Sequence, residues 1–417
     1  MLSHRKISPP RDLLLVLGLF LTYRLLYSGM AWLAADAHIA FPQWALRHPT
    51  YQIRPLVVPD WSPLWEHLLD AWYRWDTGWY LKIAALGYDA ADGSVGFQPL
   101  YPLLTRLVQP LVGGNYLLGG LLVSNLACLG AFGLFLSAAR EELHDAPLAR
   151  LALLLWAAFP AAFFLYAGYA ESLYLVCALA AWLFARRERW GWAALAGALA
   201  ALARVQGMLL CIPLGWLLAV RCTGADAAAP REQVQALLGS LRERRFWAAL
   251  FHPSQAAAWL AALAPLLAYL GQNLWLRLSG LGSITAAYSN WNTAVVPPWK
   301  GFALMVDRLL HTPMMLTDWV ELALFGAFIL LTIAGSFRIS PGFTLHNIAL
   351  LAMVLMRGAY PGGLIPGFMR YTLAAFPLFF ILAQVLQRPW QRALVTVVFL
   401  LLQALFVWAF LNWVWVA

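Results

Sequence analysis

The stretch that decides the fold lies near the N-terminus, where residues 12–35 read DLLLVLGLFLTYRLLYSGMAWLAA. A helix that crosses a bilayer needs about 20 predominantly apolar residues, and this stretch supplies them. Similar stretches recur up to Ala417, and 62% of the 417 residues are hydrophobic while 11% are charged. Because backbone polar groups in lipid must be hydrogen-bonded within their own segment, helices are expected. The sequence therefore predicts an all-α integral membrane protein with one polytopic domain over residues 1–417.

The formal net charge of the chain is +9, which raises the question of a nucleic-acid partner. Its arginines, however, cluster at the ends of hydrophobic stretches, where the positive-inside rule and anionic lipid headgroups favour them. We therefore expect the lipid bilayer, and no nucleic acid, among its partners. The cysteines show no metal-ligand spacing and lie in apolar stretches or at a predicted cytoplasmic end, so disulfides and structural zinc are not expected. They are Cys128, Cys177, Cys211 and Cys222.

The positive-inside rule arranges the apolar stretches into about eleven transmembrane helices. The segments predicted to lie outside the cytoplasm are 36–97, 280–301 and 357–371, and the Arg-rich segment 221–251 is predicted to be cytoplasmic. In the first outer loop, Trp65, Leu68, Leu69, Trp72 and Tyr73 recur at roughly helical spacing, which predicts amphipathic helices at the membrane surface. This loop is too long for a simple turn and is the first candidate for a functional site.

A carboxylate lies in this loop among aromatic and basic residues. Residues 74–88 read RWDTGWYLKIAALGY, which places Asp76 directly after Trp75. A carboxylate held near an acceptor hydroxyl can take its proton as attack develops, so Asp76 is a candidate general base. Alternatively, Asp76 caps a helix or pairs with Arg74, because Asp-Thr-Gly is also capping chemistry. Lys82 is a candidate phosphate ligand, or it extends toward lipid headgroups.

Two arginines in otherwise apolar surroundings are candidate phosphate ligands. Arg204 follows a run of small residues, and Arg370 stands beside Tyr371. A guanidinium in a membrane is costly unless it meets an anion, and its planar fork suits a phosphate. Each arginine could instead pair with Glu171 or with helix-end carbonyls. Glu171 could orient Arg204 or bind acceptor hydroxyls, or it could cap the helix that follows it.

Several short motifs occur in order along the chain. They run from Trp75-Asp76 to Gly87-Tyr88, through Asp92 and Phe97-Gln98-Pro99-Leu100-Tyr101-Pro102, to Gly168-Tyr169-Ala170-Glu171-Ser172-Leu173-Tyr174, Ala203-Arg204-Val205-Gln206-Gly207, and Arg370-Tyr371 with Pro377. Together they resemble the motifs of the PIG-V-like mannosyltransferases, a family that includes the enzyme adding the second mannose of GPI anchors. The first motif is the specific one, since its spacing matches the family pattern without a gap.

The resemblance implies a glycosyltransferase of the GT-C type, a polytopic helical bundle that uses polyprenyl-phosphate sugars and places an acidic residue in its first outer loop. By this similarity Asp76 is the catalytic base, and Arg204 and Arg370 bind the donor phosphate, with Lys82 as a third basic candidate. A single in-line displacement would invert the anomeric carbon, and this scheme requires no metal or other cofactor. Further candidates for the substrate site are Trp75, Asp92, Tyr169, Glu171, Gln206 and Tyr371.

The chain also departs from the family pattern. Gln98 replaces an expected Phe, Val205 and Gln206 replace Ser and Asn, and an extra residue separates Tyr88 from Asp92. These differences leave the acceptor open among a glycolipid, a glycan and a protein. The preference for Arg over Lys and the absence of an Asn-x-Ser/Thr sequon favour a bacterial plasma membrane with the site facing outward. In a eukaryote the expected location is the endoplasmic reticulum membrane.

Two other functional classes stay open. A transporter or flippase of lipid-linked sugars would use the same Arg and Glu side chains as ligands or gates, at a midplane site between repeats. The sequence shows no matching halves, and Asp76 lies off-centre, which favours the transferase. A noncatalytic subunit that binds lipid-linked sugars is the third class, and replacing Asp76 by Asn would then leave glycan output unchanged.

Overall fold

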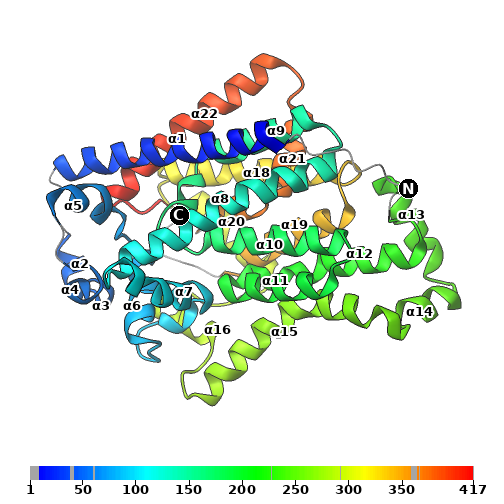
Figure 1. The fold of residues 1–417 in the computed structure, drawn as a ribbon, viewed down its shortest axis with the longest axis horizontal. Helices are drawn as coiled ribbons and strands as arrows, with labels where there is room; N and C mark the ends of the chain where they lie inside the picture. The colour runs from blue at the N-terminus through cyan, green and yellow to red at the C-terminus, as the bar shows by residue number, and fades with distance from the viewer. Residues whose placement is uncertain are drawn as a thin grey trace.

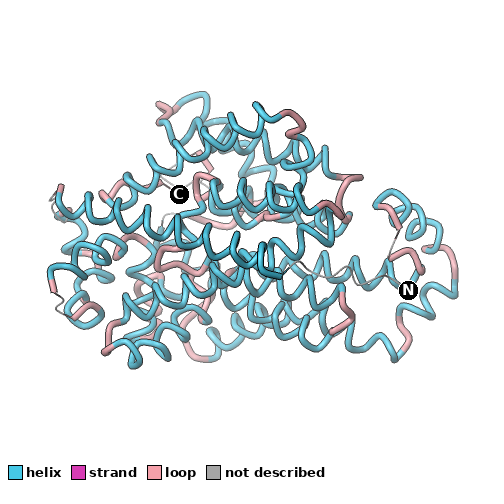
Figure 2. The backbone as a smooth tube through the Cα atoms, turned by 45° about the horizontal axis from the view of Figure 1, so that its top comes forward, coloured by secondary structure: helices cyan, strands magenta, loops and turns pink. Residues whose placement is uncertain are grey.

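The structure, a computed structural model, describes residues 9–37, 42–59, 62–226, 228–291, 293–357, 364–365 and 367–416. Over these residues the regular elements are helices (Figures 1 and 2), and the β-type pairing among them is the isolated bridge between Val295 and Arg357. The all-α prediction is confirmed for this part of the chain. Parts of the predicted segments 36–97, 221–251, 280–301 and 357–371, and Ala417, lie outside the described residues.

Six helical segments of the described chain are long and apolar enough to cross a membrane. They are Arg11–Asp36 within α1 (Pro9–Asp36), Tyr116–Leu143 (α8), Val205–Thr223 (η5, Val205–Leu210, with α12, Cys211–Thr223), Pro253–Leu278 (η6, Pro253–Gln255, with α15, Ala256–Leu278), Leu316–Gly335 (α18) and Pro389–Leu411 (α22). A seventh would be the pair α20 (Phe368–Ala374) and α21 (Pro377–Val385), which is bent by 83°. The prediction of a membrane protein with many spans is thus supported by length and composition.

Four further helices lie where the sequence predicts crossings but are only 13 to 16 residues long. They are α9 (Ala146–Ala158), α10 (Glu171–Arg186), α11 (Trp190–Ala203) and α19 (Pro341–Leu355). About 20 residues are needed to cross a bilayer, so the count of about eleven crossings stays a prediction. The connection between α9 and α10, residues 159–170, is buried, so this hairpin turns inside the protein.

The first outer loop folds into short helices, as expected, which pack onto the bundle. They are α2 (Gln43–Arg47), α3 (Pro49–Gln52), α4 (Arg54–Val57), α5 (Pro63–Leu69) and α6 (Asp76–Leu86), and α7 (Leu100–Val108) follows the loop. Of the aromatic residues that predicted amphipathic helices, Trp72 and Tyr73 are fully buried, whereas Trp65 is half exposed. The loop therefore covers one end of the bundle and is anchored there by its large side chains.

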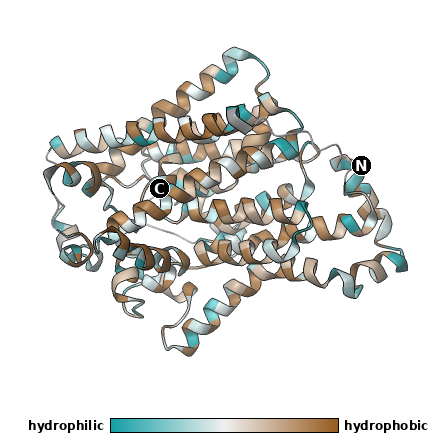
Figure 3. Cartoon of the chain, in the orientation of Figure 1, coloured by the Kyte–Doolittle hydropathy of each residue, from teal (hydrophilic) through white to brown (hydrophobic). Residues whose placement is uncertain are grey.

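The predicted outer and cytoplasmic segments lie at opposite ends of the molecule. In Figure 1, α2 to α6 and α16 (Ile284–Ala287) gather at the left, while α13 (Pro230–Ser240) and α14 (Arg244–Leu250) lie at the right. Figure 3 shows apolar residues along the bundle helices between these ends. The amphipathic helix α17 (Pro298–His311) packs against α19 and was not expected from the sequence.

The core that supports the site lies between α8, α9, α10 and α21. Trp156 on α9 stacks on Phe135 of α8, with ring centroids 4.4 Å apart, and its indole N–H donates to the carbonyl of Leu373 at 3.1 Å. Buried indole groups usually find such a partner, and here the bond joins α9 to α20. The helix that carries Arg370 is therefore fixed to the centre of the bundle.

Candidate active site

Asp76 begins α6, and its backbone is held from two sides. The preceding residue, Trp75, has φ 53° and ψ −124°, a conformation that is uncommon for a residue other than glycine. The Trp75 ring packs against those of Trp44 and Trp415, with centroids 5.5 and 5.1 Å away. The backbone N–H of Asp76 donates to the hydroxyl oxygen of Tyr169 at 3.1 Å. A strained backbone conformation persists where surrounding contacts hold it in place. Here the ring contacts of Trp75 and the hydrogen bond of the Asp76 N–H hold it.

The buried connection between α9 and α10 approaches α6 closely. A Cβ atom on Gly168 would lie 2.7 Å from the methyl group of Thr77, so only glycine permits the contact. Ser124 on α8 donates to the carbonyl of Tyr169 at 3.0 Å, and Ser172 donates to the carbonyl of Ser124 at 2.9 Å. These bonds satisfy buried backbone groups at the turn and fix the two residues, Tyr169 and Glu171, that meet the other site residues.

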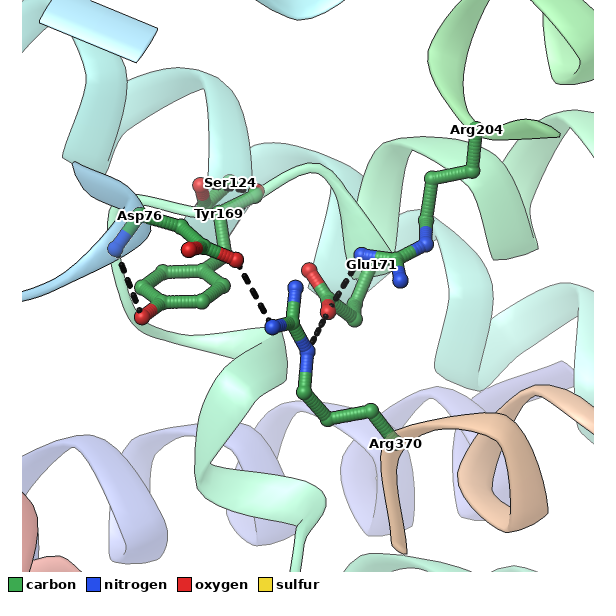
Figure 4. Close-up of polar contacts among 6 residues, drawn as sticks. All are labelled: Asp76, Ser124, Tyr169, Glu171, Arg204 and Arg370. Carbon is green, nitrogen blue, oxygen red and sulfur yellow. Dashed lines mark hydrogen bonds and ion pairs between the residues drawn. The ribbon is translucent and has the colours of Figure 1, made fainter. Parts of the chain in front are cut away.

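Four charged side chains form a continuous ionic chain (Figure 4). Arg370 donates from Nη1 to Oδ2 of Asp76 at 2.7 Å and from Nε to Oε1 of Glu171 at 2.5 Å. Arg204 donates from Nη1 to the same Glu171 oxygen at 2.5 Å. The Glu171 side chain is 2% exposed, and that of Asp76 is 19% exposed. Two positive charges thus balance two negative charges. Because these four side chains are largely buried, removing one of them leaves the charge of its partner without a counter-charge.

The structure distinguishes between the alternatives for each charged residue. Asp76 does not pair with Arg74, whose guanidinium donates to backbone carbonyls, and α6 has no side-chain cap. For Arg204 and Arg370, in contrast, the alternative partner is present, since both bind Glu171. Glu171 therefore orients Arg204, as one alternative expected, although it is also the first residue of α10.

Tyr169 completes the surroundings of Arg370. The guanidinium carbon of Arg370 lies 4.8 Å from the centroid of the Tyr169 ring and 5.1 Å from that of Phe164, so it faces two aromatic rings. Burial, reinforced by the charge of Asp76, raises the pKa of Tyr169 well above its usual value. The phenol therefore stays protonated and accepts the Asp76 N–H as a neutral group.

A cavity of about 610 Å³ opens beside the ionic chain. Of the predicted site residues, six line it: Trp75, Asp76, Arg204, Gln206, Arg370 and Tyr371. Tyr169 and Glu171 lie behind this wall and contact it through Asp76, Arg204 and Arg370. The rest of the wall is rich in aromatic side chains, among them Trp44, Tyr51, Trp79, Tyr80, Phe97, Tyr288 and Trp415. Residues from both ends of the sequence thus meet in one chamber.

Lys82 and Asp92 are not brought into this chamber. They form an ion pair with each other, with side chains 9% and 12% exposed, and neither lines the cavity. Asp92 also accepts the backbone N–H of Ser94 at 2.9 Å, so the pair folds the turn that follows α6. Because both charges are satisfied locally, this geometry does not support the predictions that Lys82 binds a donor phosphate and that Asp92 contacts a substrate.

Three charged residues that line the cavity were not singled out from the sequence: Asp318, Glu321 and Arg357. Asp318 accepts the backbone N–H of Leu364 at 2.9 Å, and Glu321 accepts that of Ile365 at 3.1 Å. The two acids therefore hold the chain shortly before α20. The signal that could have found them is their position within an apolar span, since acidic residues there mark functional sites. Over the described residues, no cluster of three His, Cys, Asp or Glu side chains is placed to hold a metal ion.

Residues 30–227 match the family model of Mannosyltransferase (PIG-V). The resemblance to the PIG-V-like mannosyltransferases is confirmed. GPI alpha-1,6-mannosyltransferase 2 of Mus musculus is 35% identical over 182 residues, which are 41% of this chain and 36% of that protein. The enzyme of the same name from Rattus norvegicus matches to the same extent. The match thus spans only about a third of the length of these PIG-V relatives.

Two solved structures resemble this chain over 94% of its length. The archaeal oligosaccharyltransferase AglB from Archaeoglobus fulgidus, in complex with an inhibitory peptide and a dolichol-phosphate, aligns with a TM-score of 0.41 at 15% identity and over 55% of its chain. The Archaeoglobus fulgidus oligosaccharyltransferase tethered to an acceptor peptide aligns with the same score and coverage at 13% identity.

Proposed function

We propose that the protein is an inverting glycosyltransferase. It moves a mannosyl or related sugar unit from a polyprenyl-phosphate-sugar donor to a hydroxyl of a glycolipid, glycan or protein acceptor. The match to the mannosyltransferase family supports this class of reaction. The observation that carries the proposal is that Asp76 lines one cavity together with the guanidinium groups of Arg204 and Arg370. A base and an anion-binding group are the two things that this reaction needs.

Asp76 has one oxygen free to act as the general base. Arg370 binds Oδ2, while Oδ1 has no hydrogen-bond partner among the described residues. The ion pair and the bond from its backbone N–H to Tyr169 fix the orientation of the carboxylate. An acceptor hydroxyl in the cavity can therefore donate its proton to Oδ1 without a rearrangement of the ionic chain. Such preorganisation lowers the barrier because the base need not be reoriented during the reaction.

The transfer is a single displacement at the anomeric carbon of the donor. The acceptor oxygen forms a bond to this carbon as the bond from the carbon to the phosphate oxygen breaks. The acceptor proton passes to Asp76, and the electron pair of the broken bond stays on the phosphate oxygen. Because negative charge grows on the leaving phosphate, cationic groups at that position stabilise the transition state. Attack opposite the leaving group inverts the anomeric configuration.

The composition of the cavity wall supports a sugar-bearing substrate. Trp44, Trp75, Trp79 and Trp415 present large apolar surfaces next to Asp76, and a few polar groups stand between them. Sites for small organic ligands are mostly apolar with a few polar groups that fix orientation. Aromatic walls also keep the local dielectric constant low, which strengthens the interaction between a phosphate and a guanidinium.

The orientation in the membrane follows from the positions of the charged segments. The helices α13 and α14, which belong to the Arg-rich segment 221–251, lie at the end of the molecule opposite to α2–α6 (Figure 1). Because Lys and Arg are enriched on the cytoplasmic side, we assign the cavity to the extracytoplasmic side. The proposed location is a bacterial plasma membrane, or the endoplasmic reticulum membrane in a eukaryote.

Transfer of labelled mannose from polyprenyl-phosphate-mannose to acceptors in membranes that contain the protein tests the proposal. Asp76→Asn keeps the shape of the side chain but removes the base, so the initial rate should fall by about a hundredfold or more. The matched control is Asp89→Asn in the same loop, where an exposed carboxylate caps the N–H of Ala91. Equal transfer by the wild type and Asp76→Asn would refute the role of the base. If the wild type moves labelled lipid across liposomes without transfer, the protein is a flippase.

A further inference from the structure

One cation in the cavity forms no ion pair with a described residue. The charges of Arg204 and Arg370 are balanced by Glu171 and Asp76 within the ionic chain. Arg357 also lines the cavity, yet its guanidinium forms no ion pair and no hydrogen bond with any described residue. The cavity therefore holds one positive charge more than the ionic chain uses.

The backbone around Arg357 is fixed, so this charge has a defined place. Arg357 forms the bridge with Val295, and the N–H of Val296 donates to the carbonyl of Met356 at 2.8 Å. The N–H of Arg357 itself donates to the carbonyl of Val354 at 3.1 Å, at the end of α19. These bonds join the segment that precedes α17 to the end of α19 and present the Arg357 side chain to the cavity.

A phenol ring lies beside the Arg357 guanidinium. Its carbon atom lies 5.7 Å from the centroid of the Tyr288 ring. On another side stands Gly367, with φ +77°, where a Cβ atom would lie 3.6 Å from both Nη1 of Arg357 and the ring of Tyr371. Glycine adopts this left-handed conformation readily and leaves the space between the two side chains open. The guanidinium is therefore bordered by rings and bare backbone, and no carboxylate is among these neighbours.

The two other carboxylates of the cavity do not supply the missing anion. Asp318 accepts the N–H groups of Met315 and Leu364, and Glu321 accepts that of Ile365. Neither forms an ion pair with Arg357 in the described part of the chain. A guanidinium in such surroundings is costly unless an anion joins it. Among the described residues, none supplies an anion in contact with the Arg357 guanidinium, which leaves it open to an anionic ligand.

We infer that Arg357 is the principal ligand of the phosphate group carried by the lipid donor. This inference rests on the proposed function and specifies which cation holds the leaving group. A phosphate that bound to Arg204 or Arg370 would compete with carboxylates 2.5 to 2.7 Å away, whereas no described carboxylate forms an ion pair with Arg357. The planar guanidinium fork matches two phosphate oxygens. Arg204 and Arg370 then position the base and add to the positive field.

Binding of polyprenyl phosphate without a sugar tests this assignment directly. The purified full-length protein is placed in nanodiscs of zwitterionic lipid, and the affinity for polyprenyl phosphate and for uncharged polyprenol is measured. Arg357→Ala should weaken polyprenyl phosphate binding by about tenfold or more, as expected for a lost charged hydrogen bond, and leave polyprenol binding unchanged. Arg357→Lys should retain part of the affinity. Arg277→Ala, which removes an exposed guanidinium outside the cavity, is the matched control.

Competition distinguishes the source of the phosphate. Unlabelled polyprenyl phosphate should displace the bound lipid, whereas millimolar inorganic phosphate or mannose 1-phosphate should not. Displacement by these soluble phosphates at micromolar concentration would overturn the assignment to a lipid donor. Wild-type affinity of Arg357→Ala for polyprenyl phosphate would overturn the role of Arg357. Equal loss of polyprenol binding would do the same, because it would show that the variant changes the shape of the cavity.

The binding assay and the transfer assay can refute the phosphate site and the transferase proposal separately. If Arg357→Ala loses phosphate affinity while the wild type transfers no sugar, the phosphate site stands and the transferase proposal falls. If transfer depends on Asp76 while Arg357→Ala binds polyprenyl phosphate normally, the transferase stands and the phosphate belongs to Arg204 and Arg370.

Discussion

The two walls of the cavity come from parts of the chain with different relationships to known proteins. Residues 30–227, which match the family model, supply Asp76, Glu171 and Arg204 to the ionic chain. The part beyond them supplies Arg370, the one group that touches both carboxylates. We call the part formed by residues 30–227 the matched wall and the part formed by later residues the second wall. The matched wall alone would supply two carboxylates and a single guanidinium to the ionic chain. A comparison limited to residues 30–227 includes Asp76 but not Arg370, its partner in the ion pair.

The largest effect on transfer is expected from removing the guanidinium of Arg370, which joins the two walls. Arg370→Ala leaves Asp76 without a cation and Glu171 with Arg204 alone. We expect the rate of mannosyl transfer to fall by about a hundredfold or more, because transition-state charge loses a preorganised partner. The free energy of unfolding should fall by about 3–5 kcal/mol, as for other broken buried ion pairs. Initial rates in membranes and thermal unfolding in detergent measure the two effects.

Arg370→Lys is the control for this variant, since it keeps the charge but loses the fork that reaches both carboxylates. It should fold more stably than Arg370→Ala and recover part of the transfer. Wild-type transfer by Arg370→Ala would show that the matched wall is sufficient and that the second wall serves only as a scaffold.

A smaller effect is expected from the matched wall, at the carboxylate that holds two arginines. Glu171→Gln keeps the size of the side chain but leaves Arg204 and Arg370 with one anion between them. Transfer at saturating donor should fall by about tenfold, because the arginines are no longer oriented. The affinity for polyprenyl phosphate should rise, since the competing carboxylate is gone. Donor titrations separate the two parameters, and a fall in both would contradict this account.

The third prediction concerns the acid that holds the second wall in place. Asp318→Ala removes the acceptor of two backbone N–H groups, those of Met315 and Leu364. Each buried donor left without a partner costs about 1–3 kcal/mol, and α20 with Arg370 should shift. We expect a severalfold loss of transfer and a lower unfolding temperature. Asp318→Asn retains one acceptor oxygen, so it can still accept one of the two N–H groups and should lose less transfer and less stability than Asp318→Ala. Equal effects of Ala and Asn would point to the charge instead.

The smallest effect is expected from the ion pair outside the cavity. In the double variant Lys82→Met with Asp92→Asn, both charges disappear together, and the amide can still accept the N–H of Ser94. Replacing both partners of a buried pair is often neutral, so transfer should stay within about twofold of the wild type. A loss comparable to that of Arg370→Ala would restore Lys82 to the site, as the sequence had suggested.

Local patterns in the sequence were enough to predict the long apolar helices and six of the residues that line the cavity. Apolar length and arginine placement locate the spans, and the Trp-Asp motif locates Asp76, because each signal lies within a few turns of chain. The pairing of Asp76 with Arg370 joins residues 294 positions apart, and the sequence around each of them does not indicate it. Proximity to Asp76 made Lys82 a candidate, but its actual partner is Asp92, ten positions later. Arg357 was not predicted as a site residue, because the sequence around it does not indicate whether its guanidinium has an anionic partner.

The order of the ionic chain along the sequence has a consequence for biosynthesis. A ribosome delivers Glu171 and Arg204 within one short stretch, so the two can enter the membrane already neutralised, as parts of neighbouring helices α10 and α11. Asp76 is synthesised before them and has no partner for its ion pair until α20, which carries Arg370, is synthesised. Until then the nascent protein carries an unsatisfied carboxylate at its surface end.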